Sequence, residues 1–180
     1  MLLTAPRRTL RGVLVRRARV ADADAIGRLH VRAWQAAYRG QMPDAYLDGL
    51  SAEDRAAGWA SGLSRPRDRD PVLVAEEDGV VVGFAAVAAS SDADSVGELH
   101  AINVDPDHWG HGVGRALIDE ATRELAQLGF GRAVLWVLPA NSRARRFYEA
   151  AGWKSDGVER TADVLGVTAP ETRYSRDIPS

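Results

Sequence analysis

Residues 104–114 read VDPDHWGHGVG, and this glycine-rich segment joins an apolar strand to an amphipathic run that begins at Arg115. We expect Gly110, Gly112 and Gly114 to take positive φ and to lie close to a ligand, so that successive backbone N–H groups point at one anion. The helix that follows adds unpaired N–H groups and the positive end of its dipole at the same place. The segment therefore predicts a site for a pyrophosphate that needs no lysine.

Two common classes of pyrophosphate site do not match this segment. A dinucleotide fingerprint requires a third glycine where the chain has Arg115, and no acidic residue ends a following strand at the expected distance. The phosphate loop of nucleotide hydrolases requires Gly-Lys-Ser/Thr, whereas the only lysine of the chain is Lys154, which follows Trp153. The sequence thus argues against a hydride carrier and, more firmly, against ATP hydrolysis.

A second segment combines a strand, a cap and a helix. The apolar run 133–138 predicts a strand, and Asn141 is placed to cap a helix from Ser142 to about Ala151. Asn141 and Tyr148 are seven residues apart, two turns on one helix face, so the carboxamide and the phenol could flank one ligand arm. Two other interpretations stay open, namely Asn141 as a cap alone and Tyr148 as a packed core residue.

Together the two segments resemble the motifs of the GNAT (Gcn5-related N-acetyltransferase) superfamily. The resemblance implies an α/β fold in which a mixed, twisted central sheet of about six to seven strands is flanked by about four helices. It extends over residues 13–178 when the flanking strands are included. The matching positions are Val104-x-Pro106 followed by 110–114, and Asn141-x-x-Ala144-x-x-Phe147-Tyr148-x-x-x-Gly152-Trp153.

The same resemblance implies roles for individual residues. The strand before the loop would pair with the pantetheine of coenzyme A through Ile102 and Val104, and Asn141 would contact the same cofactor. Tyr148 resembles the residue that protonates the departing thiolate. The chain departs from the family at Trp109, where Gln or Arg is usual, which puts a side-chain contact to phosphate in doubt there. The residues expected to bind the coenzyme A pyrophosphate are Trp109, Gly110, His111, Gly112, Val113 and Gly114.

The activity implied by the resemblance is transfer of an acetyl group from acetyl-CoA to a primary amine of a small molecule or peptide. The amine would attack the thioester directly in a ternary complex. Two other classes stay open: a catalytically silent acyl-CoA sensor or interaction module, and a polyanion-binding protein that uses its arginine-rich start. Acceptor screening separates the first from an enzyme, and a steep salt dependence of binding would identify the second.

Acetyl transfer needs a group that takes a proton from the attacking amine, whose unperturbed pKa is near ~10.4. Glu98 is the candidate base, because it starts the strand that leads to the loop and is expected to share strand parity with His100 and Ile102. His100 is the rival base, and Glu98 could instead be a solvated carboxylate at the strand end. A backbone N–H near Ile102 could polarise the carbonyl.

Aromatic residues recur in the first helical region. The resemblance implies that this region walls the acceptor pocket, which makes Trp34, Tyr38 and the strand residue His100 candidate acceptor contacts. Ordinary packing of aromatic side chains on amphipathic helices is the other interpretation. The loop also holds a small group of acids and histidines, but no further spaced set completes a recognisable metal site, so no metal is expected.

The rest of the chain alternates strands and helices. We expect one domain over residues 13–178 after a frayed leader at 1–12, although the arginines from Arg7 to Arg19 also fit a targeting peptide or a polyanion-binding arm. Asp78-Gly79 is a strong hairpin signal. The expected strands are 12–20, the two sides of 78–79, 98–104, 133–138, 154–160 and 172–178, and the expected helices are 22–38, 43–50, 51–62, 115–128 and 142–151.

Composition agrees with a compact enzyme. The 180 residues are 46% hydrophobic, and 23 basic against 25 acidic side chains leave a net charge of −2, which argues against nucleic-acid and anionic-membrane partners. The chain has no cysteine, which excludes disulfides, thiolate zinc sites and a cysteine nucleophile. The longest apolar run, 80–89, is too short to cross a bilayer. We expect a cytoplasmic protein and leave a homodimer open.

Overall fold

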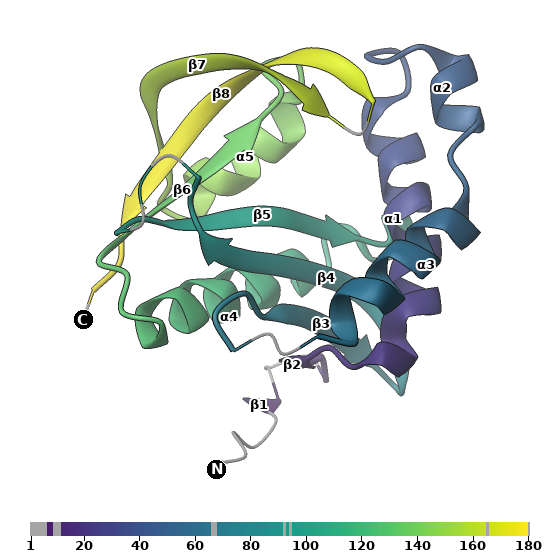
Figure 1. Cartoon of the computed structure of the whole chain (residues 1–180), viewed down its shortest axis with the longest axis horizontal. Coiled ribbons are helices and arrows are strands. Elements are labelled where there is room, and N and C mark those ends of the chain that lie inside the picture. The colour runs from purple at the N-terminus through teal and green to yellow at the C-terminus, as the bar shows by residue number, and fades with distance from the viewer. Residues whose placement is uncertain are drawn as a thin grey trace.

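A single mixed sheet organises the protein, with the strand order β1-β2-β3-β4-β5-β6-β8-β7 (Figure 1). The computed structural model describes residues 7–8, 12–65, 68–91, 93, 95–164 and 166–179. The strands are β1 (Arg7–Arg8), β2 (Leu14–Arg17), β3 (Val72–Glu77), β4 (Val80–Ala89), β5 (Gly97–Val104), β6 (Arg132–Val137), β7 (Lys154–Val164) and β8 (Val167–Asp177). The helices are η1 (Val20–Asp22), α1 (Ala23–Tyr38), α2 (Asp44–Asp48), α3 (Ala52–Leu63), η2 (Pro106–His108), α4 (Val113–Gln127) and α5 (Ser142–Ala150).

The sheet splits between its two parallel strands. Neighbouring strands are antiparallel except β5 and β6, which pair only at Gly97↔Ala133 and Glu98↔Val134. Beyond these pairs the two strands diverge, although β6 stays paired with β8 along its whole length. The edges of β5 and β6 that face each other therefore hold backbone groups that no strand satisfies, and such groups need another partner.

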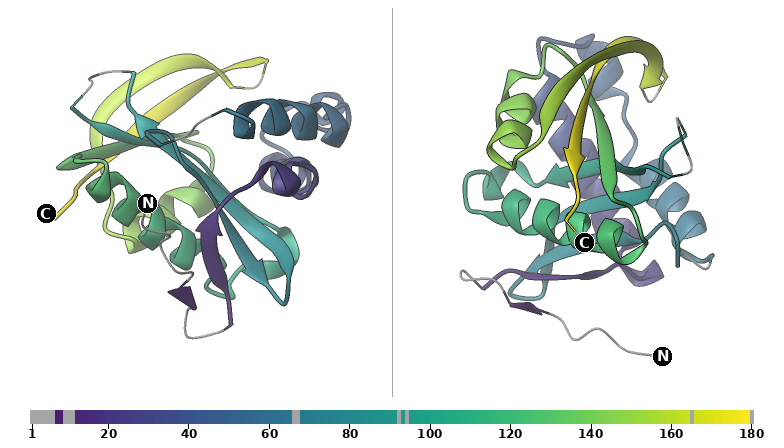
Figure 2. Two further views of the ribbon diagram at one scale, coloured as in Figure 1. Left: turned by 60° about the horizontal axis from the view of Figure 1, so that its bottom comes forward. Right: turned by 90° about the vertical axis from the view of Figure 1, so that its left-hand side faces the viewer.

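Helices cover both faces of the sheet, as the left view of Figure 2 shows. On one face, α4 and α5 pack over a core that includes Leu99, Leu117 and Trp153. On the other face, α1 and α3 cover a second core around Ile26 and Phe84. The tip of the β7–β8 hairpin packs with α1 and α2 in a third cluster of apolar side chains, which contains Trp34, Met42, Leu47, Leu138, Ala169, Tyr38, Tyr46, Leu50 and Val164.

The predicted fold class is confirmed, with differences in detail. The described residues form five α-helices, one more than about four, and seven strands of at least four residues besides the two-residue β1. Strands β7 and β8 are longer than predicted, because they continue as one hairpin through most of the loop expected between them. The expected leader at 1–12 falls mostly outside the described residues. No helix in the described ranges is long and apolar enough to span a membrane.

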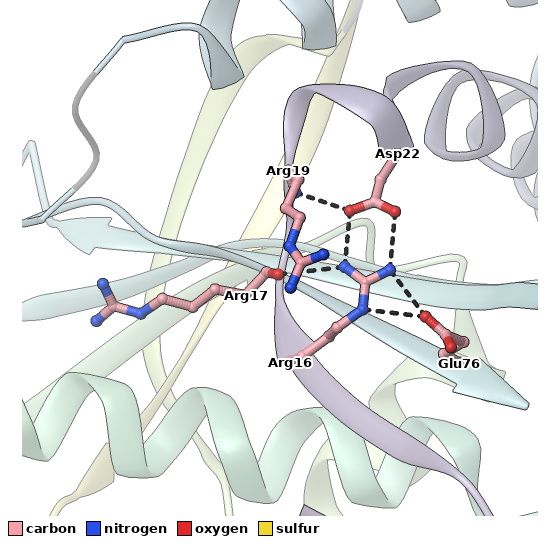
Figure 3. Close-up of polar contacts among 5 residues, drawn as sticks. All are labelled: Arg16, Arg17, Arg19, Asp22 and Glu76. Atoms are coloured by element: carbon pink, nitrogen blue, oxygen red, sulfur yellow. Dashed lines mark hydrogen bonds and ion pairs between the residues drawn. The ribbon is translucent and has the colours of Figure 1, made fainter. Parts of the chain in front are cut away.

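Arg16 ties the start of α1 to the sheet (Figure 3). Its guanidinium donates to both carboxylate oxygens of Asp22 at 2.8 and 2.9 Å, and to Glu76 on β3 at 2.8 and 3.0 Å. The hydrogen bonds from Arg16 hold the pKa of the Asp22 carboxyl below its usual range. Asp22 precedes α1 as predicted, but its side chain makes no capping bond to that helix and accepts the Arg19 N–H at 2.7 Å instead.

His30 of α1 is a buried, neutral imidazole in the core between α1, α3 and β4. Its Nδ1 accepts a hydrogen bond from Trp59 Nε1 at 3.4 Å, and its ring lies 5.5 Å from that of Phe84 and 5.8 Å from that of Trp34. Burial, with a smaller contribution from the charge of Arg55, lowers the pKa of His30 to about 4. The folded protein therefore resists protonation of this group.

We expect acid to destabilise the protein through His30. The folded pKa of His30, about 4, lies below the unfolded value near 6.5. The contribution of neutral His30 to the free energy of unfolding is therefore complete above pH ~6.5 and is lost as the pH falls toward ~4. Between pH ~7 and ~5 the free energy of unfolding should fall by roughly 2 kcal/mol through this group alone. Urea unfolding of wild type and His30→Gln at both pH values measures it, and an equal fall in the two proteins would contradict the assignment.

Candidate active site

The divergence of β5 and β6 opens a cavity of about 390 Å³. Part of its wall belongs to the glycine-rich segment 104–114, which we call the glycine loop, and to the start of α5. The rest belongs to α1, the end of β6 and the β7–β8 hairpin. The lining residues are Ala33, Ala37, Tyr38, Ile102, Asn103, Val104, His108, Trp109, Gly110, Gly112, Gly114, Arg115, Trp136, Val137, Leu138, Asn141, Arg143, Ala144, Phe147, Tyr148, Val164 and Glu171.

The glycine loop has the geometry of an anion site at two of the three predicted positions. Gly110 and Gly112 have φ of +80° and +87°, and a Cβ placed on either would meet no atom within 4 Å. Gly112 is the N-cap of α4 and supplies no side-chain cap, so the first N–H groups of that helix lack a side-chain acceptor. Open space, free N–H groups and the helix dipole together fit a phosphate group.

The prediction that Gly114 takes positive φ is wrong, and the structure gives a different reason for a glycine at this position. Gly114 lies in the first turn of α4 and does not take positive φ. A Cβ at this position would lie 3.2 Å from the Phe147 ring, so a glycine here lets α4 and α5 approach closely. Two other loop residues also lie off the cavity wall: His111 is exposed, and the Val113 side chain is buried in the core at 1% exposure.

The Trp109 side chain contacts two residues near the cavity, Val104 and Arg143. Its indole Nε1 donates to the Val104 carbonyl at 2.8 Å, which ties the loop to the end of β5. The guanidinium carbon of Arg143, on the first turn of α5, lies 3.4 Å from the centroid of its ring. Burial lowers the pKa of Arg143, and no carboxylate contributes to that shift. Arg143, which sequence reasoning missed, therefore places a cation on the cavity wall beside the glycine loop.

The α5 motif brings its two predicted residues to the cavity. Asn141 Oδ1 accepts the Ala144 N–H at 3.0 Å, which confirms the predicted cap, and its side chain is hydrogen-bonded to Tyr38 as well. Tyr148 is 9% exposed, and burial raises the pKa of its hydroxyl well above the ordinary value. At neutral pH this hydroxyl keeps its proton. Tyr38, Asn141 and Tyr148 thus present polar groups to one cavity.

Glu98 and His100 lie near the end of β5 that still pairs with β6, and neither residue lines the cavity. Glu98 Oε2 accepts from Ser90 Oγ at 2.8 Å, and Oε1 lies 3.2 Å from His100 Nδ1. Burial opposes the ionisation of Glu98, but the contacts with His100 and Ser90 outweigh it, so its pKa is lowered. The hydrogen bond to Glu98 is the largest cause of the raised pKa of His100.

The predicted strand parity of these two residues with Ile102 is wrong. On β4, Ala86 pairs with Ala101 and Val87 pairs with Leu99, so His100 is an extra residue in a β-bulge. Leu99 and Ile102, three residues apart, consequently pack in the same core. Glu98 therefore points to the face opposite Ile102, because a bulge reverses the alternation of side chains.

On the α1 side of the cavity, one predicted acceptor contact lines the wall and another does not. The Tyr38 side chain lines the cavity, whereas Trp34 is 8% exposed and packs in the α1–α2 cluster. Sequence reasoning missed Glu171 on β8, which also lines the cavity at 9% exposure. No local motif marks Glu171, since its partner Arg160 comes from the adjacent strand β7, with Nε 2.8 Å from Oε2.

Comparisons with known proteins agree on one family. The model of the acetyltransferase (GNAT) family matches residues 25–153. An N-acetyltransferase of Archaeoglobus fulgidus is 35% identical over 74% of this chain and 88% of its own, and the N-acetyltransferase YuaI of Bacillus subtilis is 33% identical over 77% and 78%. The crystal structure of PaiA N-acetyltransferase from Thermoplasma acidophilum, in complex with coenzyme A, superposes with a TM-score of 0.75 at 18% identity, over 92% of this chain and 98% of that one.

Proposed function

This chain belongs to the GNAT acetyltransferase family, and from that membership we propose that it transfers an acetyl group from acetyl-CoA to a primary amine of a small molecule or a peptide. Both substrates would bind together, with direct attack of the amine. The observation that carries the proposal is the cavity in the split sheet, which is lined both by the glycine loop and by the aromatic residues Tyr38 and Trp136. A thioester bound there would meet an amine arriving from the α1 side.

The residues of the loop side fit coenzyme A. The N–H groups around Gly110 and Gly112 would hold the diphosphate, and Arg143 would add the cation that the loop itself lacks. The edge of β5 at Ile102 and Val104, which faces β6 without pairing to it, offers backbone groups to the amides of pantetheine. Acetyl-CoA supplies the activated acyl group, so the protein needs no covalent chemistry of its own.

Two residues are proposed to transfer protons during the reaction. Tyr148 lines the cavity and has a buried, protonated hydroxyl, which suits a donor to the leaving sulfur. Glu98 is proposed as the base, acting through water, since both of its oxygens already contact Ser90 and His100 and it does not line the cavity. His100 remains the alternative, and its bulge position places it next to Glu98.

We expect Glu98→Gln to lower turnover most at low pH, and less as the pH rises, because an acceptor that is already neutral in solution needs no base. The pH dependence of kcat for wild type and variant measures this. Glu124→Gln is the matched control, since Glu124 is also buried, at 7% exposure against 5% for Glu98, but pairs with Arg17 and does not line the cavity. An equal loss at every pH would assign Glu98 a positioning role, and no loss would move the base to His100 or water.

A mass-shift screen tests the proposed function itself. The protein is incubated with acetyl-CoA and a library of primary amines and short peptides, and mass spectrometry records the addition of one acetyl group. We expect acetylated products together with stoichiometric release of free coenzyme A thiol. Tight binding of acetyl-CoA without transfer to any amine would contradict an acetyltransferase and favour the silent sensor.

A further inference from the structure

Part of the cavity wall comes from α1, the end of β6 and the β7–β8 hairpin, and we call the space beside these residues the acceptor chamber. It is lined by Tyr38 of α1, Trp136 of β6, Leu138 after β6, and Val164 and Glu171 of the β7–β8 hairpin. Tyr38, Leu138 and Val164 also belong to the cluster formed with α1 and α2, so the chamber lies on the α1 face of the sheet. Helix α4, which follows the glycine loop, covers the other face.

Glu171 is the acidic residue of this chamber, and it is ion-paired with Arg160 of β7. Among the described residues that line the cavity, Glu171 is the only one with a carboxylate, and the other chamber residues are aromatic or aliphatic. Its side chain is 11% exposed, so the charge is largely shielded from bulk solvent. Tyr38 lies close enough for the charge of Glu171 to add to the effect of burial, and both raise the pKa of Tyr38. A largely buried carboxylate can accept a second charge-assisted hydrogen bond through the oxygen that Arg160 does not bond.

A second residue fixes the direction of this carboxylate. Arg160 Nε donates to Glu171 Oε2 at 2.8 Å, while no hydrogen bond within the described part of the chain occupies Oε1. The Arg160 guanidinium in turn stacks on Trp136, with its carbon 3.9 Å from the ring centroid. One oxygen is thus held by the protein and the other remains for a ligand. The Trp136 ring already contacts two cations, because the Arg173 guanidinium carbon also lies 5.7 Å from its centroid.

We propose that Glu171 binds the ammonium group of the acceptor, and that the acceptor is a cationic primary amine on an apolar or aromatic carrier without a carboxylate near the amine. This rests on the proposed function and names the substrate class of its acceptor side. Glu171 acts here as a binding group, and proton removal from the amine is a separate step. A carboxylate next to the amine would be repelled by Glu171 in a site of low dielectric.

Calorimetric titration with small probes tests the assignment without turnover. The protein, saturated with coenzyme A, is titrated at neutral pH with phenethylamine, which is an ammonium ion there, and with the neutral analogue 2-phenylethanol. We expect wild type to prefer the ammonium by roughly ten- to a hundredfold, the range of a charge-assisted hydrogen bond. Glu171→Gln should remove the preference, because the amide still accepts from Arg160 but carries no charge.

Asp156→Asn is the matched control for this variant. Asp156 is also a carboxylate of the β7–β8 hairpin paired with an arginine, at 2.9 Å from Arg173 Nε, but it does not line the cavity. It should leave the preference unchanged. Equal binding of ammonium and alcohol by wild type would overturn the proposal even if Glu171→Gln failed to fold. Binding of L-phenylalanine as tight as phenethylamine would overturn it too, whereas a clear ammonium preference without acetyl transfer would contradict only the proposed function.

Discussion

Gly112→Asp should weaken the binding of coenzyme A by at least about a hundredfold, or roughly 3 kcal/mol, while the protein still folds. The new carboxylate would lie at the N-cap of α4, beside the first N–H groups and the positive end of the helix dipole. It would thereby occupy the anion site and repel the diphosphate. Asp tolerates the left-handed backbone of this position, where φ is +87°, better than most residues. Calorimetry for affinity and thermal unfolding for stability measure both parts.

Gly112→Asn separates charge from shape. Asn has nearly the same size and the same tolerance for positive φ, but it does not repel an anion. We expect a loss of affinity well below that of the Asp variant. Equal affinity of wild type and Gly112→Asp for coenzyme A would show that the diphosphate binds elsewhere in the molecule.

Tyr148→Phe should lower turnover by roughly ten- to a thousandfold, with little change in the affinity for acetyl-CoA. The ring would keep its packing against Phe147, at a centroid distance of 5.4 Å, so only the hydroxyl is lost. The burial that raises the pKa of this hydroxyl also makes a thiolate leaving in the same cavity more basic, so a proton on Tyr148 is useful at that point. Steady-state kinetics and calorimetry measure the two effects.

Two controls decide whether proton donation is the cause. An acyl donor whose thiol has a much lower pKa needs less protonation, so it should partly rescue Tyr148→Phe. Tyr174→Phe removes another buried hydroxyl, one that donates to Glu149 at 2.8 Å and does not line the cavity. That variant should lose stability and keep its turnover. Full activity of Tyr148→Phe with acetyl-CoA would reduce Tyr148 to a packing residue.

Local sequence patterns predicted the structure correctly wherever one short segment contains all the residues involved. Ser51 accepts the Asp54 N–H and begins α3 as predicted, and Asp78-Gly79 joins β3 to β4. The same holds for Asn141, whose cap and spacing from Tyr148 placed both residues on one cavity. Turns and caps depend on bonds between residues a few positions apart, so the sequence displays both partners at once.

The predicted alternation of side chains along β5 is wrong at the one place where this strand is irregular. The pattern from Glu98 to Val104 predicted a regular strand, but the bulge at His100 moves Glu98 to the opposite face from Ile102. A bulge forms when pairing with the neighbouring strand slips by one residue, and the strand itself need not show it. The error matters for function, because it separates the proposed base from the wall that is proposed to hold the cofactor.

The sequence by itself determined the family, the order of helices and strands, and the loop that fits a diphosphate, since those features depend on short-range spacing. Only the tertiary structure decided which charges face the cavity. Arg143 reaches it by stacking on Trp109, 34 positions earlier in the chain, and Glu171 by its pairing with Arg160 across the β7–β8 hairpin. Contacts of this kind form when distant segments pack together, and no local pattern of residue types encodes that geometry.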